Sequence, residues 1–107
     1  MVNEHLRLAQ IFKGWVDDHE NFELMAPVNL GVVCFRLNNS QPEKDLDRIN
    51  KIFLESLNRT GKVFLTQTTL KGKYVIRMAI GQRTTKERHV KDAWDLIVAE
   101  AEEALKP

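Results

Sequence analysis

The sequence predicts an α+β domain in which a four-stranded antiparallel sheet carries three helices on one face. Apolar residues recur at the 3.6-residue spacing of a helix in three separate stretches. Four segments with the alternating pattern of β-strands lie between these stretches, as two pairs on either side of the middle helix. The expected order is therefore helix–strand–strand–helix–strand–strand–helix, and strands this close in sequence pair in antiparallel fashion.

The three helices have recognisable boundaries and apolar stripes. The first is expected from about Asn3, a candidate N-cap, to about His19, and the second from about Pro42 to Arg59, before Gly61. The third has the clearest start, since a threonine and a glutamate three residues later form a capping box at Thr84 and Glu87. The core-facing stripes are Leu8, Ile11, Phe12 and Trp15; Leu46, Ile49, Phe53 and Leu57; and Val90, Ala93, Trp94, Ile97, Val98, Ala101 and Leu105.

The four strands are predicted from short apolar runs with period-two alternation. They are NFELMAP (21–27), LGVVCFRL (30–37), KVFLTQTTL (62–70) and KYVIRMAIG (73–81). Pro27 ends the first strand. Only Lys71 and Gly72 separate the last two, which predicts a tight hairpin.

The sheet is expected to have one face without a partner from this chain. Three helices, each apolar on one side, can cover only one face of a sheet. The alternation places the large apolar residues of both central strands on the covered face. The other face is predicted to carry Val32, Cys34, Arg36, Val75, Arg77 and Ala79. A half-apolar bare face is typical of a docking surface, so we expect these residues to face another part of a larger assembly.

Length and composition exclude several classes of function. A chain of 107 residues is the size of one domain, and it has no composition shift that indicates a linker. The 16 basic and 15 acidic residues are interspersed, without the basic stripe that nucleic-acid binding requires. No apolar run reaches membrane-spanning length. The single cysteine, Cys34, cannot form an intrachain disulfide and is typical of a reducing compartment, so we expect a cytoplasmic protein.

A self-contained active site is not apparent in the sequence. The three histidines, His5, His19 and His89, have no cysteine or carboxylate at metal-ligand spacing, so no metal site is predicted. The glycines are isolated and form no phosphate-binding loop. Carboxylate pairs such as Asp17–Asp18 fall on amphipathic helices, where a solvated face explains them. We therefore assign no catalytic residue to this chain.

Two strand arginines remain as candidate functional residues. From the residues alone, the favoured interpretation of both is a surface arginine that lays its aliphatic stem on the sheet and keeps its guanidinium in water. The position of Arg36 next to the end of its strand strengthens this interpretation. Arg77 lies mid-strand between apolar neighbours. A guanidinium in such a place matches a carboxylate in bidentate geometry, so Arg77 is the better candidate for binding an anion.

Several motifs carry a resemblance to a known enzyme family. FELMAP…LGVVCFRL, LNRTGKVFLTQTTLKGKYVIRMAIG and TTKERHVKDAWDLI resemble the C-terminal small domain of the group II pyridoxal-phosphate-dependent decarboxylases, in particular the aromatic L-amino-acid decarboxylases. The match runs from about Leu6 to Ala104. It departs from the family at Gln67, where relatives commonly have histidine, and the chain lacks the His-Lys pair that holds the cofactor in the family's large domain.

The resemblance implies a specific set of expectations. The whole chain, 1–107, is expected to be a C-terminal small domain of fold-type I architecture, without the catalytic large domain that binds pyridoxal phosphate. Alone it should be inactive; docked on that domain, in a homodimer, it should complete the active site for an aromatic L-amino acid. Arg77 matches the family arginine that reaches the substrate carboxylate. The resemblance does not distinguish a decarboxylase from relatives that produce an aldehyde. The alternative is a stand-alone, ferredoxin-like binding or self-association module.

Overall fold

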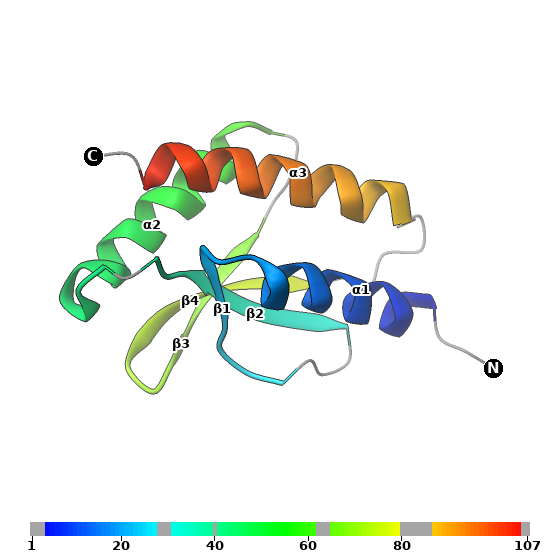
Figure 1. Ribbon diagram of the computed structural model, residues 1–107, viewed down its shortest axis with the longest axis horizontal. Coiled ribbons are helices and arrows are strands. Elements are labelled where there is room, and N and C mark those ends of the chain that lie inside the picture. The colour runs from blue at the N-terminus through cyan, green and yellow to red at the C-terminus, as the bar shows by residue number, and fades with distance from the viewer. Residues whose placement is uncertain (1–3, 28–30, 40, 62–64, 80–86, 106–107) are drawn as a thin grey trace.

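Three helices and a four-stranded sheet follow one another in the predicted order (Figure 1). The computed structural model describes residues 4–27, 31–39, 41–61, 65–79 and 87–105. The elements are α1 (Glu4–Asp18), β1 (Phe22–Leu24), β2 (Val32–Leu37), α2 (Glu43–Arg59), β3 (Thr66–Leu70), β4 (Lys73–Ala79) and α3 (Glu87–Ala104). The predicted caps at Asn3 and Thr84 lie outside the described residues.

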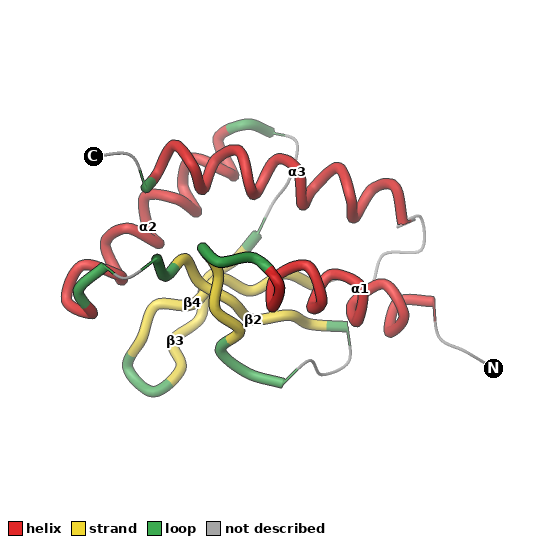
Figure 2. Tube along the Cα trace, in the orientation of Figure 1, coloured by secondary structure: helices red, strands yellow, loops and turns green. Residues whose placement is uncertain are grey.

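The sheet is antiparallel throughout, with the strand order β1-β2-β4-β3. The two long central strands pair with each other, and the shorter β1 and β3 form the edges. All three helices lie on one side of this sheet, and the hairpin that joins β3 to β4 extends away from them (Figures 1 and 2). The predicted fold class, with helices on a single face, is therefore confirmed.

Two backbone reversals depend on residues with positive φ. Lys71 (φ 52°) and Gly72 (φ 78°) form the two-residue turn between β3 and β4, and two successive left-handed residues match the twist of a β-hairpin. Gly61 (φ 73°) follows the end of α2, and its N–H donates to the carbonyl of Asn58. Glycine reaches this conformation without strain, so it ends the helix as predicted.

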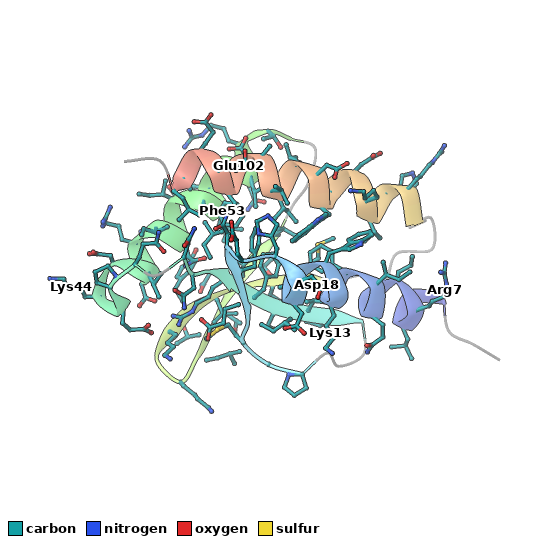
Figure 3. The ribbon with its side chains drawn as sticks, viewed as in Figure 1. Arg7, Lys13, Asp18, Lys44, Phe53 and Glu102 are labelled. Atoms are coloured by element: carbon teal, nitrogen blue, oxygen red, sulfur yellow. The ribbon has the colours of Figure 1, made fainter. Side chains whose placement is uncertain are left out.

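The core lies between the sheet and the helices. Its centre is aromatic: the ring of Phe12 in α1 lies 5.7 Å from that of Phe35 in β2 and 5.5 Å from that of Trp94 in α3. Figure 3 shows Phe53 of α2 in this interior, whereas Lys44 and Glu102 point outward. The predicted stripes supply most of the core, with Ile11, Trp15, Ile49, Val98 and Leu105 only partly buried.

Two asparagines of α2 hold the ends of strands. The buried Asn50 side chain accepts the Leu37 N–H (2.7 Å) and donates to the Leu37 and Leu46 carbonyls (3.1 and 2.8 Å). Asn58 pairs in the same way with both backbone groups of Leu65 (2.8 and 2.9 Å). An amide side chain offers one acceptor and two donors, so it satisfies backbone groups that would otherwise be buried without partners.

Candidate functional site: the outer face of the sheet

The side of the sheet opposite the helices is the candidate site, and we call it the outer face. Residues directly opposite each other in an antiparallel pair point to the same side. The register therefore places these described strand residues on the outer face: Glu23, Val32, Cys34, Arg36, Thr66, Thr68, Leu70, Lys73, Val75, Arg77 and Ala79.

Arg77 lies near the middle of the outer face and is exposed. Its cross-strand partners are Cys34 on β2 and Thr66 on β3. Among the described residues, none of the carboxylates comes within ion-pair distance of its guanidinium. Burial raises the pKa of the Cys34 thiol, and the nearby Arg77 charge opposes this rise. Arg77 is therefore a cation that is available to a ligand from outside the described chain.

Arg36 occupies a different environment on the same face. Its side chain is only 2% exposed, and carboxylates from two other elements hold its guanidinium. Glu23, its cross-strand partner on β1, accepts from Nε at 3.0 Å. Glu43, in the first turn of α2, accepts from both terminal nitrogens at 3.0 and 3.3 Å. We call Arg36, Glu23 and Glu43 the Arg36 clasp.

The clasp keeps both glutamates ionised. Burial opposes ionisation of Glu23, but hydrogen bonds from Asn38 and Arg36, with the charges of Arg36 and Lys73, outweigh it and hold the Glu23 pKa below 4.5. The Arg36 hydrogen bonds, aided by the Arg36 and Lys73 charges, likewise lower the Glu43 pKa. The Arg36 pKa is raised: its burial favours the neutral form, but the bonds and charges of the two glutamates prevail.

Two sequence-based expectations for this face are wrong. Arg36 does not keep its guanidinium in water, because the strand register brings Glu23 beside it and the start of α2 brings Glu43. Val75 is not bare either, since it has no exposed surface. Glu43 contacts both Arg36 (3.0 Å) and Lys73 (3.5 Å), and this bridge joins two strands next to Val75. The chain itself thus covers this end of the outer face.

The other end of the outer face remains open. Val32 and Ala79 are cross-strand partners there; Val32 is half-buried and Ala79 is exposed. Cys34, also half-buried, lies between this pair and the clasp. Of the residues expected to face a partner, Val32, Cys34, Arg77 and Ala79 keep accessible surface, and Arg36 and Val75 do not.

A cleft of about 440 Å³ borders the clasp where the outer face ends. It lies between the segment that follows β1 and the β3–β4 turn. Its lining residues are Glu23, Leu24, Met25, Ala26, Pro27, Leu70, Lys71 and Lys73. The lining includes no histidine or cysteine, and both of its lysines reach solvent.

Other candidate sites are weaker. His19 packs edge-on against Phe22 and Trp94, and its Nδ1 accepts the Asn21 N–H at 3.1 Å, which are contacts of a structural residue. Within the described ranges, no three residues of the metal-ligating types histidine, cysteine, aspartate and glutamate group together as a metal site. None of the helices there is long and apolar enough to span a membrane.

Nearly the whole chain is similar in sequence to known enzymes. No protein-family model matches the sequence. The chain is 35% identical over 105 residues to an aromatic-L-amino-acid decarboxylase of Catharanthus roseus, covering 98% of this chain and 21% of that protein. Over 103 residues it is 38% identical to tyrosine decarboxylase 1 of Narcissus pseudonarcissus, covering 90% and 20%. Most of these homologues are aromatic amino-acid decarboxylases. The same comparison finds a phenylacetaldehyde synthase of Arabidopsis thaliana that is 41% identical over 101 residues.

Solved structures of such decarboxylases share the fold. The Oryza sativa TDC structure with PLP and tryptamine superposes with a TM-score of 0.92 at 32% identity, over 96% of this chain and 23% of that one. The Catharanthus roseus tryptophan decarboxylase in complex with L-tryptophan gives 0.90 at 36% identity, over 95% and 21%. The chain thus spans about a fifth of the length of the decarboxylases it matches, and it corresponds to one part of them.

Proposed function

We propose that this chain is the C-terminal small domain of a pyridoxal-phosphate-dependent decarboxylase that acts on an aromatic L-amino acid. The observation that carries the proposal is the match of nearly the whole chain, in sequence and in fold, to a fifth of such enzymes. These relatives favour an enzyme domain over a stand-alone binding module. The open part of the outer face, with Val32, Cys34 and Ala79, is then the surface that docks on the large domain.

The cofactor is assigned to the rest of the enzyme. A lysine that binds pyridoxal phosphate is usually desolvated in a pocket, whereas each lysine in the described part of this chain is exposed or half-exposed. The described residues therefore do not fit the cofactor. Bound elsewhere in the enzyme, it supplies the electron sink that decarboxylation requires.

The task proposed for this chain is to bind and orient the substrate carboxylate through Arg77. A guanidinium pairs with a carboxylate through two parallel hydrogen bonds, which fix its direction as well as its position. The carboxylate loses its charge as it leaves, so the ion pair stabilises the ground state at least as well as the transition state. The benefit of Arg77 therefore lies in binding and orientation.

The proposal includes a homodimeric enzyme in the cytoplasm. The homodimer rests on the family resemblance. The cytoplasmic location is supported by the single cysteine, Cys34, which is a free thiol, because proteins of oxidising compartments commonly use cysteines in pairs.

Adding pyridoxal phosphate and aromatic amino acids to the isolated chain tests the division of labour. We expect no saturable absorption band from a lysine-bound cofactor and no release of amine, because no lysine in the described part of the chain is buried. A stoichiometric cofactor complex with turnover would show that this chain is an enzyme in its own right and would contradict the proposed role.

A further inference from the structure

The described outer face and the start of α2 bring together more cations than carboxylates. Its described strand residues include three cations, Arg36, Lys73 and Arg77, and one carboxylate, Glu23; α2 adds a second carboxylate, Glu43. Both carboxylates are bound to Arg36, and Glu43 also contacts Lys73 at 3.5 Å. Of these three cations, Arg77 is the one without an ion pair to either carboxylate.

Standard sheet spacings place Glu23 at the limit of reach of Arg77. Glu23 lies two strands and two residue positions from Arg77, about 12 Å between Cβ atoms by standard sheet spacings. An extended glutamate and an extended arginine can bridge that gap. Glu43 contacts Arg36 on β2 and Lys73 on β4, and Lys73 lies on the same strand and face as Arg77, four residues or about 13 Å before it.

We propose that Arg36 is a positioning residue that sequesters Glu23 and Glu43 and thereby keeps Arg77 available for an external carboxylate. The geometry of the clasp supports this role. Arg36 is 2% exposed and uses Nε and both terminal nitrogens on the two glutamates, while the Asn38 amide holds Glu23 from another direction at 2.7 Å. That the external carboxylate is an amino-acid substrate rests on the proposed function; the sequestration itself does not.

Chemical labelling of the 107-residue chain tests the proposal without any enzyme activity. Phenylglyoxal modifies accessible, unpaired guanidinium groups, and peptide mass spectrometry reports the rate at each arginine. In Arg36→Met, Glu23 keeps its bond from Asn38 and Glu43 keeps Lys73, but both carboxylates lose the guanidinium that binds them. Their pairing with Arg77 should then slow its labelling about two- to fivefold, the population shift that an exposed ion pair produces. Exposed Arg88, on α3, is the internal reference and should keep its rate.

A triple variant separates sequestration from simple loosening. Arg36→Met combined with Glu23→Gln and Glu43→Gln removes the competing charges, so Arg77 should label at the parent rate again. If Arg36 only stabilises the sheet, Arg36→Met should leave the labelling of Arg77 unchanged or accelerate it. The expected slowing thus has the opposite sign to the effect of a structural role.

Folding of the variants is checked by far-UV circular dichroism. Should Arg36→Met not fold, Arg36→Lys takes its place, with a smaller slowing expected because an ammonium group cannot hold both carboxylates in the same geometry. Parent-like or faster labelling of Arg77 in the folded variant overturns the proposal. So does slowing that persists in the triple variant. Either result leaves the assignment to the decarboxylases untouched, because no step of the test depends on catalysis.

Discussion

Arg36 and Arg77 point to the same face of adjacent strands, yet only Arg36 is buried and held by carboxylates. The difference comes from what lies beside each of them. Arg36 is flanked by Glu23 of β1 and by the first turn of α2, whereas Arg77 is flanked by Cys34 and Thr66, which carry no carboxylate. One arginine therefore joins elements of the fold, and the other is open to a ligand.

The burial of Val75 predicts a position-dependent response to charge on the outer face. Val75→Glu should unfold the chain, because a longer and charged side chain must enter a site that has no exposed surface, and overpacking and loss of hydration together cost several kcal/mol. Ala79→Glu is the matched control on the same strand and face, and it should be tolerated because Ala79 is exposed. Urea unfolding measures both. Equal stability of the two variants would show that Val75 is not enclosed.

The three hydrogen bonds of the buried Asn50 amide lead us to expect a large loss of stability when it is removed. Asn50→Ala removes the partners of the Leu37 N–H and of the Leu37 and Leu46 carbonyls in a site without exposed surface. Each unsatisfied buried group costs roughly 1–3 kcal/mol, so we expect a loss of at least about 2 kcal/mol in the free energy of unfolding. Asn58→Ala, at the half-buried counterpart, should cost less because water can replace the amide. The reverse ranking in urea unfolding would contradict this account.

The Arg36 clasp predicts a loss of stability in acid. The pKa values of Glu23 and Glu43 are held below 4.5 in the folded chain, so near that pH the unfolded chain binds more protons. The stabilisation is complete above about pH 4.5 and is lost as the pH falls through the lowered pKa values. Replacing all three clasp residues, by Arg36→Met, Glu23→Gln and Glu43→Gln, should flatten this acid limb in urea midpoints measured from pH 7 to pH 3. An unchanged slope would mean that other carboxylates cause the acid sensitivity.

The sequence predicts the elements and the covered face of the sheet well because both depend on local periodicity. The stripe of α2 and the alternation of β2 each follow from the spacing of apolar residues along a single element. The Lys71-Gly72 turn was predictable for a similar reason, since only a two-residue loop separates the strands. These features need no knowledge of how distant segments pair.

The clasp could not be predicted because it depends on pairing between elements. Glu23 reaches Arg36 through the register of β1 on β2, and Glu43 reaches it only once α2 is placed against the sheet. Neither relationship leaves a spacing signal in the sequence. The burial of Val75 follows from the same contacts, which is why alternation alone gave it the wrong environment. The proposed role of Arg77 came from the family resemblance and remains a prediction.

Substitution of Arg77 in the proposed full-length decarboxylase tests the central claim most directly. Arg77→Met keeps the aliphatic stem but loses the charge and the hydrogen-bond donors, and charge-assisted bonds contribute roughly 1.5–3 kcal/mol each. We therefore expect kcat/KM for the amino acid to fall about ten- to a thousandfold, at tenfold per 1.4 kcal/mol. For Arg77→Lys, which keeps the charge without the planar fork, kcat/KM should lie between the values for Arg77→Met and the parent.

The amine product lacks a carboxylate, so its inhibition constant should be the same for Arg77→Met and the parent. If Arg77→Met leaves kcat/KM intact, or weakens the amine as much as the amino acid, Arg77 does not bind the substrate carboxylate.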